Sequence, residues 1–185
     1  MSLLSRFSTS LGLAVMLTAL ASAPAFAAGE DTTAPPKPTP TPRCPSGQIH
    51  DQKSNKCVSA NSSAVDDKDR YQAVRELAYA EKYASAASVL DAMANQQDDK
   101  VLTYRGFLLR KTGQFEKAMT VYESAVAANP NNLLVRSYMG QGLVEAGDLV
   151  GAQKQHQEIL ARRGQGTWAE VSLRTALATG KTHSY

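Results

Sequence analysis

Residues 101–130, VLTYRGFLLRKTGQFEKAMTVYESAVAANP, read as two amphipathic helices, each followed by a stop signal. Gly113 follows the first apolar run, where glycine readily takes the left-handed conformation that ends a helix. Pro130 closes the second run, because proline cannot continue a helix. Two small residues, Gly106 and Ala118, stand twelve positions apart, where they allow the two helices to pack closely. The stretch therefore predicts a helical hairpin.

The same pattern recurs along the chain. Shifted by 34 residues, it returns as Gly140, Gly147, Leu149, Ala152, His156, Ile159 and Gly164. A less regular copy precedes it, in which Tyr83 and Ala86 take the places of Phe115 and Ala118 and Val74 replaces the small residue. A fixed period in this range is typical of stacked helical repeats.

The order of small residue, alanine, aromatic, alanine and proline resembles the tetratricopeptide repeat family. In this sequence the five characteristic positions are Gly106, Ala118, Tyr122, Ala125 and Pro130. The resemblance implies an all-α solenoid of helix-turn-helix units over residues 66–180, with repeats at about 67–98, 99–132 and 133–166. A stack exposes an apolar end that needs a cap, so we expect residues 167–179 to form a capping helix with Trp168 as its lid. The tail 181–185 should fray.

The first part of the chain has the features of an exported protein. Residues 1–27 carry Arg6, an apolar run and the Ala25-Phe26-Ala27 site of a secretory signal. Cleavage would leave Ala28 as the mature N-terminus and no transmembrane segment, whereas an uncleaved anchor is the less favoured alternative. Residues 28–43 alternate proline with threonine and lysine, which favours an extended spacer over a proline-rich docking ligand. We expect a periplasmic or secreted protein.

The chain's two cysteines lie in a short segment, residues 44–58. In an oxidising compartment an even cysteine count favours a disulfide, so we expect Cys44 and Cys57 to be bonded, with Ile49 on the one apolar face of a small hairpin. Metal binding by both thiols and His50 is the less favoured alternative. The segment resembles short modules beside repeats in exported bacterial proteins, and we expect it to be structurally independent of the helices.

Composition and motifs exclude several classes of function. The formal net charge is +3, but residues 66–180 hold 14 Lys and Arg against 14 Asp and Glu, interspersed. Nucleic-acid binders usually cluster basic residues on one face. The three histidines are scattered, and the sequence has no nucleophile elbow and no phosphate loop. We therefore predict no enzyme, no cofactor, no metal site and no nucleic-acid partner, and leave the oligomeric state open.

The family resemblance places the binding surface on the inner face of the first helix of each repeat. The predicted partner-binding residues are Lys68, Tyr71, Arg75, Tyr79, Lys100, Thr103, Phe107, Arg110, Lys111 and Gln141. Cations and aromatic rings together favour an acidic protein or peptide partner over a merely solvated helix face. The predicted function is a protein-interaction scaffold in the cell envelope. The alternative is glycan or cell-wall binding through the Cys44–Cys57 hairpin, with the repeats as a presenter.

Overall fold

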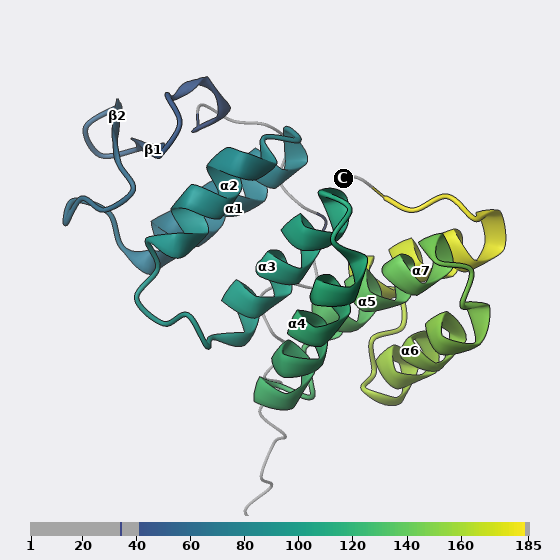
Figure 1. Cartoon of the computed structure of the whole chain (residues 1–185). Coiled ribbons are helices and arrows are strands. Elements are labelled where there is room, and N and C mark those ends of the chain that lie inside the picture. Colours follow the sequence, from purple (N-terminus) through teal and green to yellow (C-terminus); the bar gives the residue numbers. More distant parts are fainter. Residues whose placement is uncertain (1–33, 35–40, 184–185) are drawn as a thin grey trace, which may run out of the picture.

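The computed structural model describes Ala34 and residues 41–183; the predicted signal sequence and most of the predicted linker lie outside this part. The described residues form seven α-helices, which follow one another as three antiparallel pairs and a final helix (Figure 1). They are α1 (Asp67–Tyr79), α2 (Tyr83–Asp91), α3 (Asp99–Lys111), α4 (Phe115–Ala128), α5 (Leu133–Glu145), α6 (Leu149–Ala161) and α7 (Trp168–Thr179). The predicted fold class, an all-α stack with a terminal helix, is confirmed. No helix in the described part combines the length and apolar character needed to cross a bilayer.

Local sequence explains where the helices begin and end. Side-chain caps start five of the seven: for example, the Asp98 carboxylate accepts the Lys100 amide at α3, and Asn132 accepts the Val135 amide at α5. Gly113, between α3 and α4, has φ +80°, as the helix-stop pattern predicts. The corresponding turn between α1 and α2 has no glycine, and there Glu81 takes φ +58°. A non-glycine residue in this region carries a steric cost, so the first turn is the least ideal of the three.

Small residues set the close packing within the central pair. Tyr122 of α4 is fully buried, and its ring lies directly over Gly106 of α3. A Cβ added at Gly106 would lie 2.5 Å from two ring carbons of Tyr122. Ala118 and Ala125 on the same face of α4 are also fully buried. The alternation of small residues and one large ring that identified the repeat is therefore a packing requirement.

Aromatic contacts join the first helices of successive repeats. Tyr71 of α1 meets Tyr104 of α3 edge-on, with ring centroids 5.5 Å apart. Tyr104 in turn meets Tyr138 of α5 at 6.0 Å. Edge-to-face pairs of this kind are favourable beyond the area they bury. The helices α1, α3 and α5 thus form one continuous layer, the inner layer of the stack.

A disulfide-bonded hairpin precedes the helices. Its strands β1 (Gln48–Asp51) and β2 (Lys56–Ser59) pair antiparallel, and Cys44 is bonded to Cys57 as predicted. Ile49 is 1% exposed and belongs to the helical core. Residues 41–43, which the sequence assigned to the linker, instead form the 3₁₀ helix η1 against α1.

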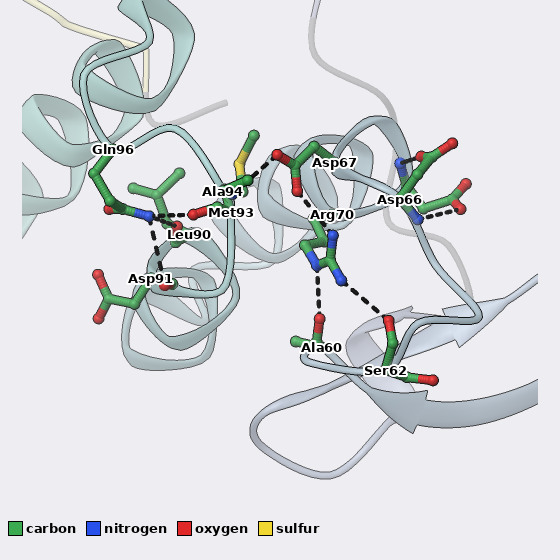
Figure 2. Close-up of polar contacts among 11 residues, drawn as sticks. Ala60, Ser62, Asp66, Asp67, Arg70, Leu90, Asp91, Met93, Ala94 and Gln96 are labelled. Atoms are coloured by element: carbon green, nitrogen blue, oxygen red, sulfur yellow. Dashed lines mark hydrogen bonds and ion pairs between the residues drawn. The ribbon is translucent and has the colours of Figure 1, made fainter.

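One arginine fixes the hairpin to the helices, so the two parts are in direct contact, while the expectation that the helices persist without an intact hairpin stays a prediction. Arg70 of α1 donates through Nε to the carbonyl of Ala60 at 2.7 Å and through Nη2 to that of Ser62 at 3.0 Å (Figure 2). Its Nη1 pairs with Asp67 at 2.8 Å, and the other carboxylate oxygen of Asp67 accepts the Ala94 amide at 3.0 Å. This clamp joins the hairpin exit, α1 and the loop after α2. No sequence motif marks it.

Candidate partner-binding surface

The predicted binding residues divide into two groups in the structure. Six, all on α1 and α3, are exposed or half-buried on the inner layer: Lys68, Tyr71, Arg75, Tyr79, Lys100 and Lys111. Four are buried: Thr103, Phe107, Arg110 and Gln141. Helical periodicity places all ten on the inner stripe, but part of that stripe packs against neighbouring helices and does not face a ligand.

Three residues of the first group gather at one pocket near the beginnings of α1 and α3. The pocket has a volume of about 250 Å³, and its lining includes Lys68, Tyr71 and Lys100, together with Met93 and Asn95 from the loop that follows α2. The ammonium group of Lys100 lies 5.6 Å from the centroid of the Tyr71 ring, within the range of a cation–π contact. We call this the α1–α3 pocket. It combines cations from two repeats with an aromatic face.

Two carboxylates also line the α1–α3 pocket, but both are engaged in holding the fold. Asp67 pairs with Arg70 and accepts the Ala94 amide (Figure 2). Asp98 caps α3 by accepting the Lys100 amide at 2.9 Å. In the described part of the chain, Lys68 forms no ion pair within 4 Å with either carboxylate. An anionic ligand would therefore meet, at Lys68, a positive charge that these two aspartates do not pair directly.

The remaining exposed residues extend the surface along α1 and α3. The guanidinium of Arg75 donates to the carbonyl of Ala34 at 3.3 Å, so a residue from before the hairpin lies against the middle of α1. At the far end of α3, burial and then the adjacent Arg110 guanidinium lower the pKa of Lys111. A nearby carboxylate would oppose both effects, because it favours the charged form of lysine.

Thr103, Phe107 and Arg110 lie in the helical interior, where they do not form contact surface as predicted, whereas Gln141 is buried beneath the end of the chain. Phe107 has no exposed area and packs against Tyr138, with ring centroids 5.0 Å apart. The guanidinium of Arg110 lies 5.6 Å from the Phe107 ring and pairs with Glu145 of α5 at 3.0 Å. Thr103 donates to the Asp99 carbonyl within its own helix. Alanine at Phe107 would therefore cost stability before it affected binding.

The hairpin side of the molecule offers a different kind of cleft. It lies between the hairpin and α1, and its lining includes His50, Gln52, Asp69, Gln72 and Glu76. No tryptophan, tyrosine or phenylalanine ring lines it, so it lacks the aromatic faces on which sugar rings usually stack. Within residues 41–183, no group of three His, Cys, Asp or Glu side chains is placed to hold a metal ion.

Comparison with known proteins adds one finding. A family model described as "Tetratricopeptide repeat" matches residues 99–142, which cover α3, α4 and most of α5. No curated protein and no solved structure matches the chain. The matched residues include the Gly106–Tyr122 packing and the inner face of α3, and the same helix-turn-helix unit recurs before and after them. Residues 99–142 therefore match the tetratricopeptide repeat family, and the helices on either side of them are arranged in the same way.

Proposed function

We propose that this protein is an exported interaction scaffold whose α1–α3 pocket binds an acidic, extended segment of a protein partner. Tetratricopeptide repeats generally mediate interactions between proteins, and the coarse function follows from the family. The proposal adds three points: the binding site is the α1–α3 pocket, the partner's segment is acidic, and the protein acts in the cell envelope. The observation that carries it is the contact between Lys100 of one repeat and the Tyr71 ring of the preceding repeat.

The pocket's chemistry suits a segment that carries carboxylates beside apolar side chains. Lysines 68 and 100 would attract carboxylates from a distance, and the Tyr71 ring would then pack against an apolar side chain once water is expelled. Attraction between exposed charges is screened beyond a Debye length of about 10 Å at 0.1 M salt. Association should therefore slow as salt rises, while dissociation should respond mainly to loss of the aromatic contact.

Two features support an extracytoplasmic location. The predicted signal sequence ends at Ala27, and the Cys44–Cys57 bond is of a kind that persists in oxidising compartments. N-terminal sequencing of the protein from the exported fraction should find Ala28 first. Retention of Met1 in that fraction would contradict the predicted cleavage.

The binding site is tested by placing a photo-cross-linking residue at Tyr71 or, as a control, at Lys154 on the exposed side of α6. Irradiation of the producing cells should yield a defined adduct from position 71 and none from position 154. Binding of the identified partner should then weaken with salt, and charge reversal at Lys68 and Lys100 should slow its association. Adducts from both positions alike, or from position 154 alone, would refute the assignment.

A further inference from the structure

The end of the chain folds back onto the inner layer, although the sequence favoured fraying. Gly180 ends α7 with φ +70°, and the chain then turns toward α5. The backbone amide of His183 donates to Oε1 of Gln141 at 2.9 Å, and the Thr182 hydroxyl donates to Oε1 of Glu145. Both acceptors lie on the inner face of α5. A backbone amide and a hydroxyl of an extended segment are thus bound by side chains of the third repeat.

The acceptors are held in place by the surrounding helices. Nε2 of Gln141 donates to Ser137 at 3.2 Å, and Ser137 contacts Ser172 of α7 at 2.9 Å, which leaves Oε1 of the amide directed at the tail. Glu145 also accepts from Arg110 of α3 at 3.0 Å. These groups form a prepared surface, since their positions are fixed by contacts that do not involve the tail.

The tail also covers the one tryptophan of the chain. The imidazole of His183 meets the Trp168 ring edge-on, with centroids 5.0 Å apart. The indole N–H of Trp168 is buried and has no acceptor among the residues that the structure describes. A buried donor without an acceptor carries an energetic cost. The tail therefore covers this surface but leaves the indole N–H of Trp168 without an acceptor.

We propose that residues 181–183 act as an internal ligand of the α5–α7 face, which an extended segment of a partner occupies by displacing them. A displacing segment would present a backbone N–H to Gln141, a hydroxyl to Glu145 and a ring to Trp168. A carbonyl or carboxylate oxygen would in addition satisfy the indole N–H. The competition rests on the proposed scaffold function, but the docking of the tail does not.

The test uses Trp168 fluorescence, which needs no partner. The chain truncated after Gly180 should show red-shifted emission relative to the full chain, because its indole loses the cover of the tail. The acetylated peptide Lys-Thr-His-Ser-Tyr should reverse the shift when added to the truncated chain. Because the tail is joined directly to α7, its effective concentration is in the millimolar range, so a labelled form of the peptide should bind the full chain several-fold more weakly than the truncated chain, as measured by the anisotropy of the label.

Two point variants separate docking from general effects of the tail. His183→Ala should reproduce the shift of the truncated chain, whereas Lys181→Ala, which changes an exposed side chain, should leave the emission unchanged. Equal emission from the full and truncated chains would overturn the docking. Peptide binding that is equal in both chains, or absent from the truncated chain at millimolar peptide, would overturn the competition. Neither result bears on the cross-linking at Tyr71, so the two proposals fail separately.

Discussion

Replacing Gly106 with alanine tests the packing on which the repeat is built. Alanine is the better helix former, by about 1 kcal/mol in a helix interior. The added methyl, however, would lie 2.5 Å from two ring carbons of Tyr122. That ring has no exposed area and is enclosed by the protein, so it cannot swing out into solvent. We therefore expect the substitution to destabilise the protein.

The expected loss in the free energy of unfolding follows from these two opposing effects. Forcing an extra carbon into a packed core typically costs about 1–3 kcal/mol, and contact with two ring carbons of a fully enclosed side chain points to the upper part of that range. After the helix-propensity gain of about 1 kcal/mol, a net loss of about 2 kcal/mol remains. For a helical domain of this size it corresponds to a fall of roughly 8 °C in Tm.

Urea denaturation followed by circular dichroism measures the loss, with Gly142→Ala as the matched control. Gly142 is also a buried helical glycine, but the atoms nearest to an added methyl there belong to the side chains of Met119, at 2.8 Å, and Arg110, at 3.0 Å, and not to a ring. The thioether adjusts at little cost, so Gly142→Ala should destabilise the protein less than Gly106→Ala. Equal effects of the two substitutions, or stabilisation by Gly106→Ala, would refute the packing argument.

Three further predictions concern the repeats and the hairpin. Ala118→Leu should lower the free energy of unfolding by about 1–3 kcal/mol, whereas Ala127→Leu, at an exposed site, should change it little; equal losses in denaturation would undo the assigned register. Burial alone would raise the pKa of Glu170, but hydrogen bonds from a histidine of α6 and an arginine of α7 lower it below its usual 4.5. The resulting stability is present at neutral pH and lost as acid protonates the carboxylate, so urea midpoints of Glu170→Gln should fall less on acidification than those of the wild type. Reduction of the Cys44–Cys57 bond should loosen the hairpin while the helical circular-dichroism signal remains; loss of that signal would mean that the bond supports the whole stack.

The helical architecture could be predicted because its determinants are local or periodic. Gly113, Gly147 and Pro130 mark the ends of helices. The small residues at 106 and 118 mark where paired helices pack against each other. The cysteine pairing could be predicted for a similar reason, since only one intramolecular pair is possible. Each of these features can be recognised from the sequence without knowing which distant residues it contacts in the fold.

The binding surface could be predicted only in part, because exposure depends on partners distant in sequence. Tyr71 and Phe107 both lie on inner helices, yet one lines a pocket and the other is covered by neighbouring rings. Arg70 has no motif that reveals its bonds to the hairpin exit. The docked tail depends on Gln141, about 40 residues away, and no local pattern pairs the two.

The central claim is that the α1–α3 pocket binds an acidic segment, and selection from a random peptide library tests it most directly. Peptides that bind the wild-type protein should be enriched in Asp and Glu. They should lose most of their affinity for Lys68→Glu/Lys100→Glu and retain it for Lys117→Glu/Lys154→Glu, which makes the same charge change at exposed sites on α4 and α6. Selected peptides without acidic enrichment, or equal binding to both double variants, would contradict the claim.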